Sequence, residues 1–176
     1  FNSSSYQNVA VSNEHMSPKT NDLTVLLWFK RSVITGNKEW LFDSKTCDSN
    51  GLGYYLAVNT DNSLVVKFQY IGADGEAINI GTPSNVANNT SWNFSALVIR
   101  RTSSQIIYLN NVVVGQISRS ASAGIDIISP SIVFGSSECG ASYPTTRFNG
   151  YIDDARVYNR ALSVSEISQI YNQTKG

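Results

Sequence analysis

The 176-residue sequence contains a single histidine, His15, and two cysteines, Cys47 and Cys139. It carries no net charge, because 13 basic side chains balance 13 acidic ones. One histidine cannot supply a multi-histidine zinc site. The two cysteines lie too far apart for a C-x-x-C redox motif. No nucleophile-elbow motif accompanies the histidine, so a Ser-His-Asp triad has no support.

Long apolar and basic runs are also missing. No stretch approaches the roughly 18 apolar residues of a transmembrane helix, so we expect no membrane insertion. Arg100-Arg101 is only a pair, which is typical of a solvated strand end. We expect no nucleic-acid partner, since the capture of polyanions needs a broad basic patch. The chain begins at Phe1 and not at a methionine, so we expect upstream sequence and a truncated opening strand.

Short segments rich in β-branched and aromatic residues recur between turn-forming residues, a pattern typical of a sandwich or barrel. Residues 23–30 are apolar on both faces, which predicts a central strand. Asn110-Asn111 predicts a type I′ hairpin turn, because asparagine tolerates positive φ. Further strands are predicted at 40–45, 54–58, 64–68, 92–99, 106–109, 112–115 and 131–135.

The C-terminal segment carries the signature of one short helix. Ser163 and Glu166 have the spacing of a capping box, and Leu162 can pack against Ile167 as a hydrophobic staple. An apolar stripe would lay this helix on the sandwich; it consists of Ile167, Ile170 and Tyr171.

The most informative stretch is residues 148–163, FNGYIDDARVYNRALS. Ile152, Ala155 and Val157 are apolar, so the period-2 alternation of the strand changes parity at Asp153-Asp154. Such a change predicts a β-bulge, which re-aims the side chains around it.

This stretch resembles the last strand of laminin-G-like, concanavalin A-like jelly-roll domains, which often read F-x-G-x-I-D-D-V-R-I-Y-N-R-A-L-S. Residues 24–30 are similar to the first core strand of that family, 92–96 to its W-H-x-V-A strand, and 108–115 to its L-Y-V-N-G-x-L-V-G hairpin. Residues 1–4 resemble its F-D-G-S opening. The resemblance implies an all-β, concanavalin A-like jelly-roll β-sandwich of two antiparallel sheets with a short C-terminal helix. It implies one domain over residues 1–176.

The resemblance also implies a structural calcium ion (Ca²⁺) between the opening loop and the last strand. The matching positions are Asn2 and Asp153, with Asp154 as the second choice. Calcium prefers several oxygen ligands, and Asn2 lacks the charge of the aspartate that is usual there. The alternative is that the two aspartates accept backbone hydrogen bonds at the bulge or pair with Arg156.

Cys47 and Cys139 lie in segments rich in Ser, Gly, Asp and Glu, which are typical of loops. One interpretation is a disulfide that joins two loops of an exported protein, and the other is two free thiols. We expect an extracellular location, either secreted or at the cell surface.

Catalysis is the least favoured function. Jelly-roll glycoside hydrolases hold two carboxylates about 5–5.5 Å or roughly 6.5–9.5 Å apart. Side chains on one face of a strand are two residues apart, so such a pair would give an E-x-D-x-E pattern, which this sequence lacks. We expect no enzyme activity, and a divergent polysaccharide hydrolase or lyase ranks last.

Sugar sites use aromatic rings that stack on the apolar face of a pyranose. Trp28 and Trp92 match core positions of the family and are predicted to be buried. The predicted ligand-binding residues are instead Trp40, Tyr55, Tyr143 and Arg147.

We therefore predict a non-catalytic carbohydrate (glycan) binding module of a secreted or cell-surface protein, as part of a larger multidomain polypeptide. The second hypothesis is a laminin-G-type protein–protein interaction and cell adhesion domain that binds a cell-surface ligand.

Overall fold

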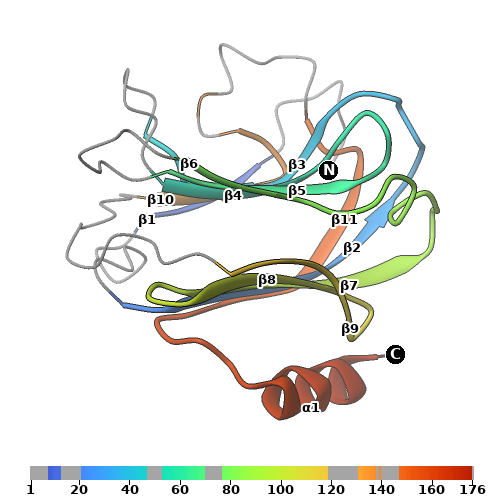
Figure 1. Cartoon of the computed structure of the whole chain (residues 1–176). Coiled ribbons are helices and arrows are strands. Elements are labelled where there is room, and N and C mark those ends of the chain that lie inside the picture. Colours follow the sequence, from blue (N-terminus) through green and yellow to red (C-terminus); the bar gives the residue numbers. More distant parts are fainter. Residues whose placement is uncertain are drawn as a thin grey trace.

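The computed structural model of the chain describes residues 8–12, 21–46, 53–69, 77–118, 131–137, 139 and 147–175. These residues form two antiparallel sheets stacked as two layers, with one helix outside (Figure 1). The predicted β-sandwich with a C-terminal helix is therefore confirmed. No helix in this part of the chain is long and apolar enough to cross a membrane.

One sheet has six strands. In spatial order they are β1 (Val9–Ser12), β10 (Ser131–Phe134), β3 (Glu39–Asp43), β4 (Gly53–Val58), β5 (Leu64–Gln69) and β6 (Ala77–Gly81). The sequence pattern does not predict β1 or β6. Both are short and lie at the two edges of the sheet, where each pairs on one side only.

The other sheet has five strands. In spatial order they are β11 (Gly150–Tyr158), β2 (Leu23–Arg31), β7 (Trp92–Arg100), β8 (Ser104–Leu109) and β9 (Val112–Ile117). β2 lies between β11 and β7, as its apolar sequence predicted. Asn110 and Asn111 join β8 to β9 with φ angles of 50° and 67°, which confirms the predicted type I′ geometry.

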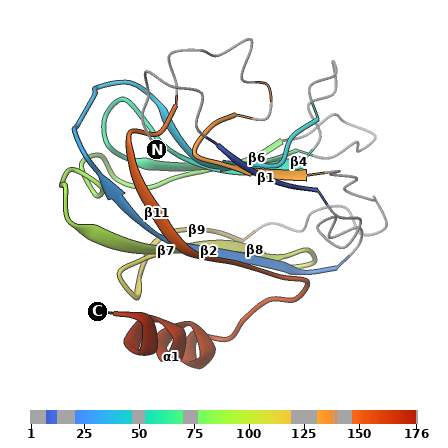
Figure 2. The same ribbon diagram turned by 180° about the vertical axis from the view of Figure 1, so that it is seen from behind.

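Two apolar layers explain why β2 is apolar on both faces. Leu27 and Phe29 point into the core between the sheets, where they join Phe42, Leu56, Phe68 and Leu97. Leu26 and Trp28 point outward into a second core under the helix, which also contains Phe94, Tyr108, Leu162 and Ile167. Figure 2 shows the helix from behind, outside the sheet that contains β2, β7 and β8.

The helix, α1 (Val164–Thr174), begins where the sequence predicted. The Ser163 side chain accepts a hydrogen bond from the Glu166 N–H, and Glu166 accepts one from the Ser163 N–H at 2.8 Å. This is the predicted capping box. Leu162 and Ile167 are both buried in the second core, as expected for the hydrophobic staple.

An ion pair is buried at one end of the sandwich. Arg31, in the last position of β2, donates from Nε to Glu39 Oε2 at 2.7 Å, and both side chains are almost completely inaccessible. Arg31 also donates to the Asn62 side chain and the Ala87 carbonyl. Burial raises the pKa of Glu39, although the Arg31 charge lowers it in part. The pair joins the two sheets, because Glu39 is the first residue of β3.

Candidate binding groove

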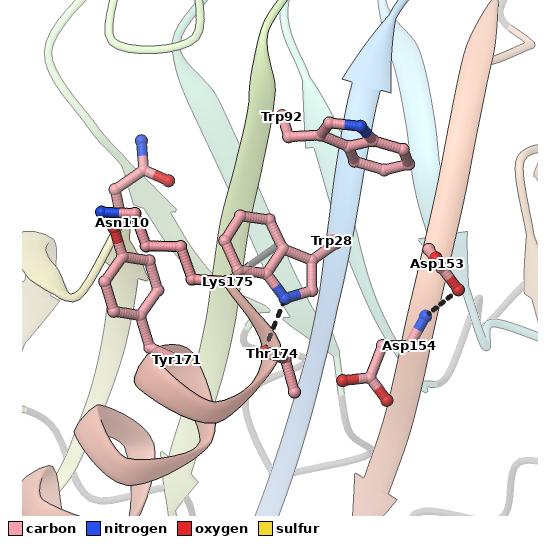
Figure 3. A pocket seen from close by; sticks show the side chains of 8 residues that line it. All are labelled: Trp28, Trp92, Asn110, Asp153, Asp154, Tyr171, Thr174 and Lys175. Atoms are coloured by element: carbon pink, nitrogen blue, oxygen red, sulfur yellow. Dashed lines mark hydrogen bonds between the residues drawn. The ribbon is translucent and has the colours of Figure 1, made fainter.

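A groove of about 520 Å³ opens on the outer face of the five-stranded sheet, beside the C-terminal end of α1 (Figure 3). Strand β11 borders one side and the last turn of α1 the other. The lining combines aromatic rings with carboxylate, amide, hydroxyl and ammonium groups. The residues are Trp28, Trp92, Asn110, Asp153, Asp154, Tyr171, Thr174 and Lys175.

The groove exists because α1 covers only part of the sheet. Its 11 residues span about 16 Å, whereas the nine residues of β7 extend about 30 Å. Phe94, Ala96 and Val98 of β7 lie in the core under the helix. Trp92, two residues before Phe94, continues the same face beyond the helix end. The uncovered end of the sheet therefore forms the floor of the groove.

Trp28 marks the boundary between the covered and open parts of this face. Its indole Nε1 donates a 2.8 Å hydrogen bond to Thr174 Oγ1. Its ring stacks on Tyr171, with the two ring centroids 5.7 Å apart and an interplanar angle of 16°. Trp28 is buried, as the sequence predicted. These contacts fix the end of α1 against β2.

Trp92 and Tyr151 present aromatic surface to solvent. Trp92 is 43% exposed and Tyr151 is 59% exposed, and their ring centroids are 6.4 Å apart. Both pair with Lys30 of β2, so they lie in one transverse row of the sheet. The prediction that Trp92 is a core residue is wrong, because α1 ends before it reaches this row.

Strand β11 carries the β-bulge that the parity change predicted. Asp153 pairs with Trp28 and Arg156 pairs with Leu26, so two residues of β11 lie opposite one residue of β2. Asp154 has φ = 47°, in the left-handed region. The bulge places both aspartates along one side of the groove (Figure 3).

Each of these two carboxylates has a partner. Asp154 accepts two hydrogen bonds from Arg156, at 2.8 Å from Nε and 2.9 Å from Nη2. This contact raises the pKa of Arg156. Asp153 accepts the backbone N–H of Asp154 at 2.8 Å. These two contacts hold the acids in place at the groove.

The opposite side of the groove is also ordered by contacts. Asn110 Oδ1 accepts the Phe94 N–H at 2.9 Å, and its Nδ2 donates to Asn93 Oδ1 at 3.0 Å. Lys175 Nζ lies 5.5 Å from the centroid of the Tyr171 ring. The Asn110 amide therefore has a defined orientation before any ligand binds.

The predicted ligand residues Trp40, Tyr55 and Arg147 lie together, but on the other sheet. Trp40 and Tyr55 pack edge to face, with ring centroids 4.5 Å apart, and Arg147 forms a backbone bridge with Trp40. All three are buried, at 4%, 7% and 8% exposure. The two rings therefore offer little open surface for a sugar. Tyr143 lies outside the described residues, and the ligand role of these four residues stays a prediction.

Only some residues of the predicted calcium and disulfide sites are among the described residues. Asn2 and Cys47 lie outside the described residues. Among the residues that are described, no group of three or more His, Cys, Asp or Glu side chains could hold a metal. Cys139 Sγ lies 4.0 Å from the carbonyl oxygen of Thr46, the residue before Cys47. Both the calcium site and the disulfide stay predictions.

The two antiparallel sheets and the helix packed outside them define a jelly-roll β-sandwich domain. Residues 3–168 match the Laminin_G_3 family model, described as the concanavalin A-like lectin/glucanases superfamily, and the protein belongs to this family. The resemblance inferred from the sequence motifs is thus confirmed. No curated protein gives a match to the sequence.

Solved structures with a similar fold include binding domains of bacterial toxins. The binding domain of Paraclostridial Mosquitocidal Protein 1 has a TM-score of 0.71 at 19% identity, covering 98% of this chain and 42% of that one. The binding domain of botulinum neurotoxin DC in complex with rat synaptotagmin II has a TM-score of 0.68 at 17% identity, covering 94% and 40%.

A third structure concerns botulinum neurotoxin type C, whose cell entry depends on interaction with two ganglioside molecules. It has a TM-score of 0.68 at 18% identity, with coverage of 94% and 39%. The chain thus spans about two fifths of the length of these structures. At these identities the likeness shows the fold alone.

Sequence reasoning missed Trp92 and Tyr151 as exposed aromatic residues of a site. A signal for Trp92 was present: it shares its strand face with Phe94, and a three-turn helix is shorter than the strand it covers. Tyr151 precedes the bulge by two residues, on the same face as Asp153. Their convergence depends on the pairing of β11, β2 and β7, which the sequence pattern did not specify.

Proposed function

We propose that this protein is a non-catalytic glycan-binding module and that the groove beside α1 holds the sugar. The observation that carries the proposal is the exposed Trp92 ring, which lines the groove together with the carboxylates of Asp153 and Asp154 and has the exposed Tyr151 ring beside it. An exposed ring can stack on the C–H face of a pyranose, and carboxylates accept hydrogen bonds from its hydroxyls. Lys175 adds a donor at the helix side of the groove.

The contacts of the two acids support binding without turnover. A general acid needs a carboxyl oxygen within hydrogen-bond reach of the leaving group. The Arg156 guanidinium forms a bidentate contact that occupies both carboxylate oxygens of Asp154. Asp153 accepts the backbone N–H of Asp154, which fixes the orientation of its side chain. The pair thus suits hydrogen-bond acceptance from a ligand.

Replacement of the exposed ring tests the proposal. A glycan array identifies ligands of the unaltered protein, and calorimetry then compares Trp92→Ala with Val112→Ala. Val112 is an exposed apolar side chain on β9, outside the groove, and serves as the control. We expect Trp92→Ala to weaken binding at least about tenfold, since a central aromatic contact often dominates affinity. An array without any glycan signal, or equal affinities for both variants, would contradict the proposal.

A protein-interaction domain is the second candidate. Strand β9 is an edge of its sheet, and its Val112 and Val113 are 62% and 46% exposed. Edge strands can pair with an extended partner segment. A flat glycan array together with a pull-down that Val113→Lys abolishes and Trp92→Ala leaves intact would favour this candidate.

We further propose that the module belongs to a larger exported protein and that Cys47 bonds to Cys139. The Cys139–Thr46 contact supports the bridge, since it places Cys139 beside the residue that precedes Cys47. Mass spectrometry of tryptic peptides with and without reductant tests the disulfide. For the structural calcium ion, calcium should raise the melting temperature, EDTA should reverse the rise, and Asp153→Asn should abolish it.

A further inference from the structure

We propose that the six-stranded sheet carries a second site, in which Lys38, Lys45 and Lys67 bind an anionic group of a glycan, a sulfate or a carboxylate. The nature of the molecule that carries this group rests on the glycan-binding function proposed above. The anion site itself rests on different residues, on the opposite sheet from the groove.

Two aromatic rings hold the first ammonium group. Lys38 Nζ lies 4.3 Å from the centroid of the Trp40 ring and 4.5 Å from that of Tyr55. It also donates a 3.2 Å hydrogen bond to the Tyr55 hydroxyl. A cation above an aromatic face is attracted by the ring quadrupole. Lys38 therefore occupies ring surface that a sugar would otherwise use, and its charge becomes the binding feature.

Two further lysines converge on the same tyrosine. Lys45 Nζ lies 5.5 Å from the Tyr55 ring centroid. Lys67 of β5 is the direct cross-strand partner of Tyr55 in β4, so both side chains stand on one face of the sheet. That face is the outer one, because the flanking residues Tyr54 and Leu56 belong to the core between the sheets.

Among the described residues none of the three lysines forms a salt bridge, although Asp43, the cross-strand partner of Tyr55 in β3, lies on the same face of the sheet. The charge of Asp43 raises the pKa of Lys38 in part. The Asp43 carboxylate also accepts hydrogen bonds from the Ser137 hydroxyl at 2.7 Å and the Lys45 N–H at 3.1 Å. Burial and the Lys45 charge lower the pKa of Lys38, and the same two causes lower the pKa of Lys67. A bound anion would relieve this repulsion.

The chemistry of lysine decides the class of ligand. Each ammonium is a compact charge with three donors and no acceptor, so the cluster offers donors to several oxygens of one anion. Sulfate and carboxylate groups present such oxygens. A neutral sugar would leave the positive charges uncompensated and would gain little here.

The first experiment uses inorganic sulfate, so that its result does not depend on any glycan. Sulfate is titrated into the full chain at constant ionic strength, and the amide resonances of β3, β4 and β5 are followed by NMR. We expect saturable shifts there, with affinity about threefold weaker in Lys67→Gln, because one partly exposed charge contributes a modest interaction. Arg100→Gln is the control, since it removes the same charge on the other sheet.

The second experiment identifies the group on the glycan. Binding of lactose, 3′-sialyllactose and lactose 3′-sulfate is compared by calorimetry at low and high salt. We expect at least one anionic form to bind more tightly than lactose, with an advantage that shrinks in salt and is lost in Lys45→Gln/Lys67→Gln. Unshifted sulfate spectra, or a preference that survives in the lysine variant, would overturn the site. Saturable sulfate shifts without any saccharide binding would instead refute the proposed glycan function and leave the anion site standing.

Discussion

The indole nitrogen of Trp28 donates a hydrogen bond of 2.8 Å to the hydroxyl of Thr174, and this bond ties the last turn of α1 to strand β2. Thr174 in turn donates to the Ile170 carbonyl at 2.8 Å, so its hydroxyl links the sheet to the helix backbone. Both residues line the groove, so the position of its helix side depends on a contact that also stabilises the fold.

Removal of the Thr174 hydroxyl tests this dual role. Thr174→Val keeps the shape of the side chain but leaves the Trp28 N–H without its partner. We expect the free energy of unfolding to fall by about 1 kcal/mol, with a change in tryptophan fluorescence. Thr174→Ser keeps the hydroxyl and should resemble the unaltered protein in urea denaturation. Equal stability of the two variants would show that the bond contributes nothing.

The left-handed backbone of Asp154 makes a second prediction. A β-branched residue is strained at φ = 47°, so Asp154→Val should destabilise the protein by about 1–2 kcal/mol. Asp154→Asn tolerates the same backbone and loses only the ion pair with Arg156, which is partly exposed. We expect its loss of stability to stay below about 1 kcal/mol. Chemical denaturation separates the two variants, and a ranking in the opposite order would contradict the prediction.

The buried ion pair between Arg31 and Glu39 should be costly to break. Arg31→Met leaves the Glu39 carboxylate buried without its counter-charge, and we expect a loss of about 3–5 kcal/mol at pH 7. Arg160→Met breaks the exposed pair with Glu166 and should cost far less.

The loss of stability in Arg31→Met should become smaller as the pH falls. Burial already raises the pKa of Glu39, and removal of Arg31 takes away the charge that lowers it. The folded variant then binds a proton more tightly than the unfolded chain. Its stability relative to the unaltered protein therefore rises as the pH falls from 7 to 5. Urea denaturation at both pH values measures the difference. An equal loss at pH 7 and pH 5 would argue against a buried, uncompensated carboxylate.

The capping box predicts a pH dependence of the opposite sign. Hydrogen bonds from Arg160 and from Ser163 lower the pKa of Glu166 to about 2. The folded state therefore releases this proton more readily than the unfolded chain. The contribution of Glu166 is fully present above its unfolded pKa and is lost as the pH falls through the folded value of about 2. We expect Glu166→Gln to flatten the stability profile between pH 5 and pH 2, as followed by circular dichroism. A profile identical to that of the unaltered protein would contradict this assignment.

The sequence predicted those features that local chemistry determines. The capping box at Ser163, the turn at Asn110 and the bulge at Asp153-Asp154 each follow from a few neighbouring residues, and each is present. The family motifs added the fold class, a concanavalin A-like jelly-roll β-sandwich. The groove was not predictable in this way, because its residues Trp92 and Asp153 are about 60 positions apart and meet only through strand β2, which pairs with both β7 and β11.

The placement of Trp40 shows the complementary difficulty. It begins the strand predicted over residues 40–45, which is a position compatible with exposure, yet it is 4% exposed. It is buried because Tyr55 and Lys38 pack against its ring, and Tyr55 comes from the neighbouring strand. A pattern within one strand indicates which of its residues lie on the same face of the sheet. It does not report what covers that face.

The two outer faces of the sandwich point in opposite directions, with the aromatic groove on one and the lysine cluster on the other. The sheets themselves are about 10 Å apart, so a short saccharide cannot engage both faces of one copy. A copy docked through one face would therefore keep the other available to a different chain. If both faces were occupied, the domain would link two separate glycan chains. Its avidity would then depend on how densely those glycan chains are spaced.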